Sequence, residues 1–125
     1  MALNNPYAQY KQNTVMTAPP EELTLMLFEG MVKFINQSKL FMQEKKLDKA
    51  SNANLRAQDI IAELNLTLNM KYDISKNLRT LYDYMSRRLI EANLKKDVDI
   101  LEEVLGLATE LRDTWKEAIK IARKG

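Results

Sequence analysis

The distribution of proline constrains this chain more than any other feature of its sequence. All three prolines, Pro6, Pro19 and Pro20, lie within the first twenty residues. Because proline removes a backbone donor and clashes with the preceding helical turn, its absence after Pro20 leaves the rest of the chain able to form long helices. That stretch is rich in leucine, methionine, alanine, glutamate and lysine, and it shows no sustained strand-like alternation. The sequence therefore predicts an all-α fold.

Apolar residues recur every three or four positions in four blocks that are separated by short polar breaks. These blocks predict helices at about 20–44, 48–69, 74–94 and 98–123. Asp48, Asp73 and Asp97 stand where N-caps of the last three helices are expected. Short breaks join antiparallel neighbours, so we expect an antiparallel up-down-up-down four-helix bundle. In that topology Gly30 and Gly106 lie in adjacent helices, where they either allow a close backbone approach or are simply tolerated.

The blocks also predict which residues face the core. The third helix carries Ile74, Leu78, Leu81, Met85, Leu89 and Ala92 at spacings of three or four residues. The last helix carries Leu101, Val104, Ala108, Leu111, Trp115, Ala118 and Ala122 in the same manner. Such spacing is typical of the packing seams of helical bundles.

The first nineteen residues differ in character from the rest of the chain. They are polar, they contain all the prolines except Pro20, and they carry Tyr7 and Tyr10. A short helix starting at Pro6 would place both tyrosines on one face, but so short a helix is unstable alone. A chain of 125 residues fits one domain. We therefore expect a mobile N-terminal arm at 1–19 and a single bundle domain at 20–125.

Composition argues against catalysis and against several classes of ligand. The chain has no cysteine and no histidine, which removes thiolate ligands, the commonest transition-metal ligand and the commonest general base. The acidic residues lie mostly off the apolar seams, and no glycine-rich phosphate loop exists. We expect no metal, no cofactor and no enzymatic activity.

Charge and hydropathy set the expected surroundings of the protein. The formal net charge is only +2, with both signs interspersed, so we expect no nucleic-acid partner. No apolar stretch is long enough for a membrane span, and the first residues lack the pattern of a signal peptide. We expect a soluble cytoplasmic protein without membrane insertion.

The apolar faces of the first and last helices are wider than a small bundle can bury. Leu25, Phe28 and Val32 widen the first face, while Ile100 and Leu107 widen the last. We expect these residues to lie at a rim where they bind a partner, because exposed apolar strips mark protein-binding grooves. Two alternatives stay open: the strips form a homodimer face in the free protein, or they belong to a thick core.

Five collinear segments give the chain a family resemblance. They lie at 5–18, 20–30, 57–69, 77–93 and 110–115. Together they cover nearly the whole chain, and they resemble the flagellar secretion chaperones of the FliS family. One departure is that this family usually has serine before the first helical proline, where this chain has Pro19. The lost side-chain cap would cost about 1 kcal/mol.

The resemblance implies a cytoplasmic bundle that binds the disordered C-terminal segment of flagellin. It implies that the chaperone prevents premature polymerisation and delivers flagellin to the flagellar type III export gate, which Tyr7, Tyr10 and Val15 of the arm would help to contact. Apolar grooves suit amphipathic client segments that fold into short helices on binding. Two competing hypotheses are a self-associating structural or regulatory bundle and, less favoured, a small helical enzyme.

Overall fold

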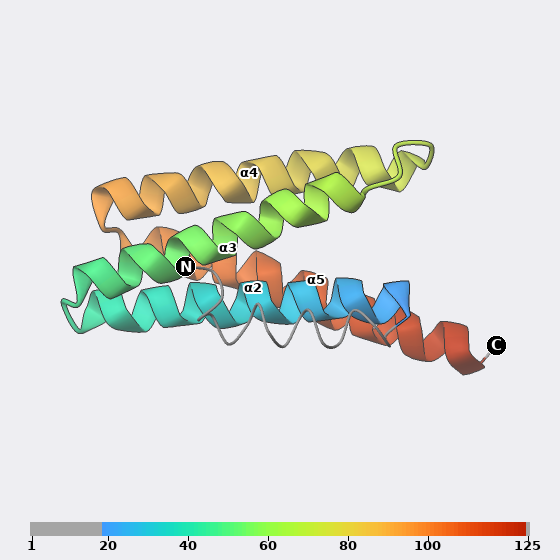
Figure 1. Cartoon of the computed structure of the whole chain (residues 1–125), viewed down its shortest axis with the longest axis horizontal. Coiled ribbons are helices and arrows are strands. Elements are labelled where there is room, and N and C mark those ends of the chain that lie inside the picture. The colour runs from blue at the N-terminus through green and yellow to red at the C-terminus, as the bar shows by residue number, and fades with distance from the viewer. Residues whose placement is uncertain (1–18, 125) are drawn as a thin grey trace.

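The protein is described from Pro19 to Lys124 by a computed structural model, which consists of four long helices. The helices are α2 (Pro20–Gln43), α3 (Leu47–Thr67), α4 (Asp73–Lys95) and α5 (Val98–Lys124). They run alternately up and down (Figure 1), and each packs against its two neighbours in the ring. No strand occurs within this stretch. The predicted all-α bundle is confirmed, and each helix begins and ends within a few residues of its expected position.

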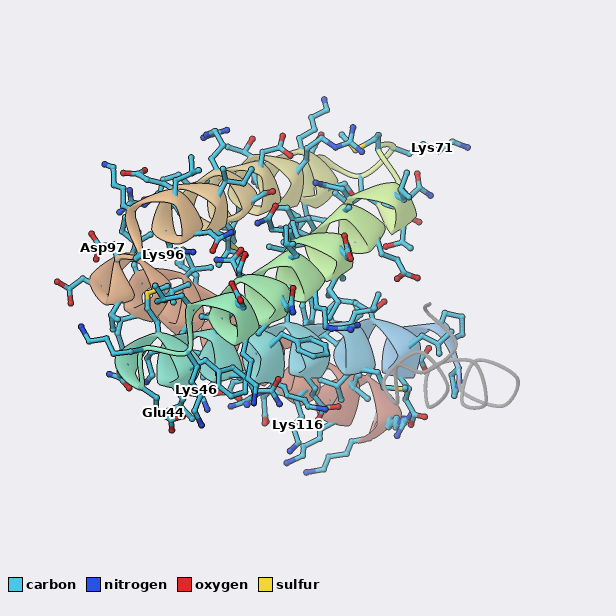
Figure 2. The ribbon with its side chains drawn as sticks, turned by 60° about the vertical axis from the view of Figure 1, so that its left-hand side comes forward. Glu44, Lys46, Lys71, Lys96, Asp97 and Lys116 are labelled. Carbon is cyan, nitrogen blue, oxygen red and sulfur yellow. The ribbon has the colours of Figure 1, made fainter. Side chains whose placement is uncertain are left out.

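Two of the three connections are tight turns that depend on lysine in the left-handed region. Lys45 has φ 64° and Lys96 has φ 54°, a conformation that usually favours glycine. The amide of Lys46 donates to the carbonyl of Phe41, and the amide of Asp97 donates to that of Ala92. Figure 2 shows Lys46 and Lys96 at one end of the bundle and Lys71 at the other.

Only one of the three aspartates expected as N-caps occupies that position in the structure. Asp97 caps α5 as expected, because its Oδ1 accepts hydrogen bonds from the amides of Asp99 at 2.9 Å and Ile100 at 3.3 Å. The expectations for Asp48 and Asp73 were wrong: each lies inside the first turn, where its charge still favours the helix N-terminus. Pro19 is the N-cap of α2 and has no side-chain cap bond.

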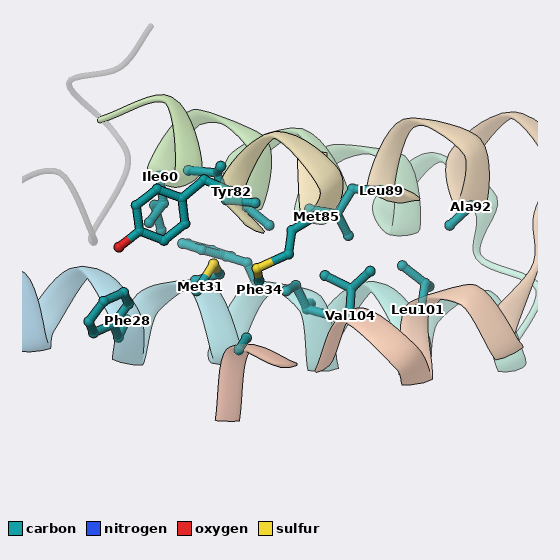
Figure 3. Close-up of a cluster of buried hydrophobic side chains, with 14 of the residues drawn as sticks. Phe28, Met31, Phe34, Ile60, Tyr82, Met85, Leu89, Ala92, Leu101 and Val104 are labelled. Atoms are coloured by element: carbon teal, nitrogen blue, oxygen red, sulfur yellow. The ribbon is translucent and has the colours of Figure 1, made fainter. Parts of the chain in front are cut away.

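The core is closed at the end where the two lysine turns lie and opens toward the other end. Met85, Leu89, Leu101 and Val104 are fully buried between α4 and α5 (Figure 3). Farther along the same seams burial declines. Leu78, Leu81, Leu111 and Trp115 are only partly buried, and Ile74 is 61% exposed. In the described part of the chain no helix is both long and apolar enough to cross a membrane.

Gly106 does not mediate a close backbone approach. A Cβ built at this position would meet no atom within 4 Å, so of the two alternatives the simple tolerance of a glycine holds at Gly106. Replacing Gly106 by alanine should therefore raise the free energy of unfolding by about 0.5–1 kcal/mol, because glycine is unfavourable in a helix interior. Urea unfolding of the two proteins measures the difference. A destabilised G106A variant would show that the helix needs this glycine.

Candidate functional site

The open end of the bundle contains an apolar groove between α4 and α5. The groove exists because α4 packs less extensively on its neighbours than α2 does. Within residues 19–124, the side-chain hydrogen bonds between α4 and α5 involve only Tyr84, Arg88 and Glu103, toward the closed end. Toward Ile74 the two helices are no longer joined in this way, and their seam residues are left half covered.

The main part of the groove is a cavity of ≈ 350 Å³ to which all four helices contribute. Its floor includes Phe28 of α2, Leu64 of α3 and Tyr82 of α4, which are all buried. Ile74 and Leu78 line it from α4, while Leu111, Thr114 and Trp115 line it from α5. None of its lining side chains is charged. The cavity therefore suits an apolar group with few polar atoms.

Two smaller hollows extend the cavity along α5. One of ≈ 220 Å³ lies between α4 and α5, is lined by Leu81 and Leu107, and shares Leu111 and Thr114 with the cavity. The other, of ≈ 310 Å³, lies beside the second half of α5. It shares Trp115 with the cavity. The three hollows follow one another along α5, the last of them between α5 and α2, and together we call them the α4–α5 groove.

Trp115 separates the cavity from the hollow near the C-terminal end of α5. Its ring meets that of Phe28 edge to face, with centroids 6.2 Å apart and planes at 74°. Its Nε1 donates to the carbonyl of Glu21 at 2.8 Å. An ion pair between Arg123 and Glu22 joins the same two helices beyond it. These contacts hold the Trp115 ring in place as a wall of the groove.

A charged network closes the other end of the groove. Glu103 of α5 accepts hydrogen bonds from the Tyr84 hydroxyl at 2.5 Å and from Arg88 Nε at 2.8 Å, and both donors lie on α4. The bond from Tyr84, followed by that from Arg88, lowers the pKa of the Glu103 carboxyl below its usual 4.5. The same bond raises the pKa of the Tyr84 hydroxyl.

The lowered pKa of Glu103 predicts how this closure depends on pH. A carboxyl whose pKa is lower in the folded protein stabilises the fold above its unfolded pKa, near 4.5, and loses that effect as the pH falls through the folded value. We expect Glu103→Gln to be less stable than the natural protein at neutral pH, with a smaller difference at about pH 3. Urea unfolding at both pH values tests this, with Glu117→Gln as an exposed control on the same helix. An equal difference at both values would exclude a role for the ionised carboxylate.

The structure corrects the expected exposure of two candidate partner-binding residues. Phe28 is 3% exposed and Ile100 is 6% exposed, so neither lies at a rim. Phe28 nevertheless forms part of the cavity floor. Ile100 is buried near the start of α5, away from the groove. At these two positions the wide apolar helix faces are therefore packed in the core. Contact of either residue with a partner stays a prediction.

The other candidates are divided between two surfaces. Leu107 lines the groove, as described above. Leu25 and Val32 are half-buried and lie fourteen and seven residues, respectively, before Lys39, which contacts Glu102 of α5 at 2.8 Å. This spacing puts them on the flank of α2 that faces α5. Tyr7, Tyr10 and Val15, with the rest of the expected arm up to residue 18, lie outside the described residues.

Sequence reasoning missed the α4 side of the groove. Ile74, Leu78 and Leu81 were expected in the core, because their spacing continues that of Met85 and Leu89. Spacing shows which residues share a helix face, but not whether a neighbouring helix covers that face. The groove contains no metal site either: among residues 19–124 no group of three or more acidic side chains could hold an ion.

Comparisons with known proteins agree with this geometry. The family model described as flagellar protein FliS matches residues 3–122. The flagellar secretion chaperone FliS of Bacillus subtilis is 46% identical over 99% of this chain and 93% of its own length. The Escherichia coli protein of the same name is 36% identical over 90% of this chain and 86% of its own. A solved structure described as a flagellar chaperone from bacteria has the same fold, with a TM-score of 0.75, 22% identity, and coverage of 91% of this chain and 94% of that one. The chain therefore belongs to the FliS family of flagellar secretion chaperones.

Proposed function

We propose that this protein is a cytoplasmic export chaperone that binds the disordered C-terminal segment of flagellin in the α4–α5 groove. The observation that carries the proposal is a row of three mostly apolar hollows along α5 in a member of a chaperone family. Covering the client segment would prevent premature polymerisation. Release at the flagellar type III export gate would then deliver flagellin for secretion.

The dimensions of the groove support a helical client. Leu107, Leu111, Trp115 and Ala118 line it from one helix, at spacings of four, four and three residues. From the first to the last of these residues α5 rises roughly 16 Å, or about three helical turns. An amphipathic client helix of similar length could place successive apolar side chains in the three hollows. The ordering of a disordered client opposes binding, which keeps the complex weak enough for later release.

The single tryptophan provides a direct test. Trp115 lines the groove, so its emission should change when a synthetic, tryptophan-free peptide of the flagellin C-terminal segment is added. We expect saturable binding that depends little on salt, because the contacts are mostly apolar. A scrambled peptide of the same composition is the control. Absence of saturable binding, or equal binding of the scrambled peptide, would contradict the proposal.

We further propose that residues 1–16 cover the groove in the free protein and that flagellin displaces them. Residue 19 begins the described chain immediately before α2, whose Glu21 and Thr24 line parts of the groove. Tyr7, Tyr10 and Val15 supply apolar area for such contacts, and once free they would be available to the export gate. Covering the groove would lower the apparent client affinity by the fraction of protein that is open.

Deleting residues 1–16 tests this role of the arm. We expect tighter or at least undiminished binding of the flagellin peptide, stronger binding of an apolar dye, and stability within about 1–2 kcal/mol of the intact protein. Export of flagellin should nevertheless decrease in cells that carry the truncated protein. Unchanged dye binding, peptide affinity and export would leave the arm without a role.

A homodimer is the other way to cover the groove. Exposed Tyr72 and Ile74 at its edge favour self-association when no client is present. Sedimentation of the intact and truncated proteins distinguishes the two coverings. A monomer that dimerises only after removal of residues 1–16 supports the arm, whereas an intact dimer that dissociates on peptide addition supports self-association.

A further inference from the structure

Two hydroxyl groups that open into the cavity have no partner among residues 19–124. Tyr82 is 2% exposed and Ser75 is 4% exposed, and both line the cavity from α4. Neither hydroxyl forms a hydrogen bond with a residue that the structure describes, and neither oxygen is a fully buried atom without a partner, so both are open to the cavity. The other two buried polar side chains of the core are paired: Ser38 donates to the carbonyl of Ala50 at 2.7 Å, and Asn54 donates to that of Leu89 at 2.9 Å. A ligand that fills the cavity would remove water from both hydroxyls, so it should offer them a hydrogen-bonding group.

The two hydroxyls lie on one face of α4. Ser75 and Tyr82 are seven residues apart, which is close to two helical turns. Side chains on a helix lean toward its N-terminus, so the Tyr82 ring extends toward the turn that holds Ser75. Figure 3 shows the Tyr82 hydroxyl on the side of Phe28, away from Met85 and Leu89. Both groups therefore serve the same cavity.

The surroundings determine which group the hydroxyls can bind. No charged side chain lines the cavity, and burial raises the pKa of Tyr82 to about 12, so its hydroxyl stays protonated. A charged ligand group would lose its hydration without a counter-charge, which is costly. A purely apolar ligand would strip water from both hydroxyls and leave them unpaired. A neutral hydrogen-bonding group within an apolar segment satisfies both conditions.

We propose that Tyr82 and Ser75 form a specificity-determining pair that binds a neutral amide group of the client segment in the cavity. This inference rests on the proposed function, because the client is the flagellin C-terminal segment. The amide is either a side-chain carboxamide of asparagine or glutamine or a main-chain peptide group at a helix end. The pair would fix the register of the client, which apolar contacts alone define poorly.

Isothermal titration calorimetry with the flagellin peptide tests the pair. Tyr82→Phe and Ser75→Ala should each weaken binding about fivefold to tenfold, since each leaves a client hydrogen-bonding group without its partner. Because both residues serve one group, the double variant should lose less than the product of the two effects. The unfolding midpoint should stay unchanged, since neither hydroxyl has a protein partner to lose. Ser86→Ala is a matched control on the same helix outside the cavity and should bind as the natural protein does.

The outcomes separate this inference from the proposed function. Unchanged or tighter binding by both cavity variants would overturn the pair while leaving the groove as the client site. If the natural protein does not bind the peptide, the proposed function itself fails, and the pair fails with it. Replacing each asparagine and glutamine of the peptide by leucine identifies the amide. If one replacement makes the natural protein and Tyr82→Phe bind the peptide equally, the side chain replaced is the amide that the pair binds. If the difference in affinity survives every replacement, the pair binds a main-chain peptide group.

Discussion

Ile74→Asp should weaken binding of the flagellin peptide at least about a hundredfold without unfolding the protein. Ile74 is 61% exposed at the edge of the cavity, so the free protein accommodates an aspartate there in water. It is also the second residue of α4, where a negative charge favours the helix N-terminus. A bound client would bury that carboxylate against apolar groups, and the lost hydration opposes binding.

Ile90→Asp is the matched control. Ile90 lies on the same helix, is 45% exposed, and is outside the groove. The substitution introduces the same charge, so a general electrostatic effect would appear in both variants. Fluorescence titration of Trp115 measures both affinities, and circular dichroism confirms that both variants are folded. Equal affinities for the two variants would place the client elsewhere on the protein.

The contrast between Ile74 and Leu89 shows how far the sequence predicts this fold. Proline placement and apolar spacing predicted four helices and their order, because both properties act locally along the chain. The burial of Leu89 followed from its place on a seam. Ile74 continues the same seam and is exposed, because α5 does not cover that part of α4. Coverage depends on the relative positions of two whole helices, which no local pattern encodes.

The candidate site was less predictable than the fold for two further reasons. Phe28 was expected at a rim and is buried, because a wide apolar face looks alike in sequence whether it meets a neighbour or solvent. Ser75 and Tyr82 carried no signal at all, since serine and tyrosine are ordinary on helix surfaces. Their significance appears only when the structure shows that both hydroxyls open into one cavity without a partner among the described residues. The left-handed turn at Lys96 was not predicted either, because glycine is the residue that usually indicates such a turn.

Because the bundle is closed at one end only, replacing leucine by alanine on α4 should lower the free energy of unfolding by very different amounts at the two ends. Leu89 is fully buried at the closed end, whereas Leu81 is partly buried in the wall of the groove. Leu89→Ala should lower the free energy of unfolding by about 2–5 kcal/mol, because it removes buried apolar area and leaves a cavity. The Asn54 bond to the Leu89 carbonyl should survive, since it involves only the backbone of that residue.

Leu81→Ala should cost only about 1–2 kcal/mol, since part of this side chain already faces the groove and no closed cavity would form. Urea unfolding followed by circular dichroism gives both values. The same two variants should rank in the opposite order for client binding, where Leu81 contributes a groove contact and Leu89 does not. Equal costs of unfolding would mean that α4 and α5 pack along their whole length in solution, and the groove would then have to open before any client could enter it.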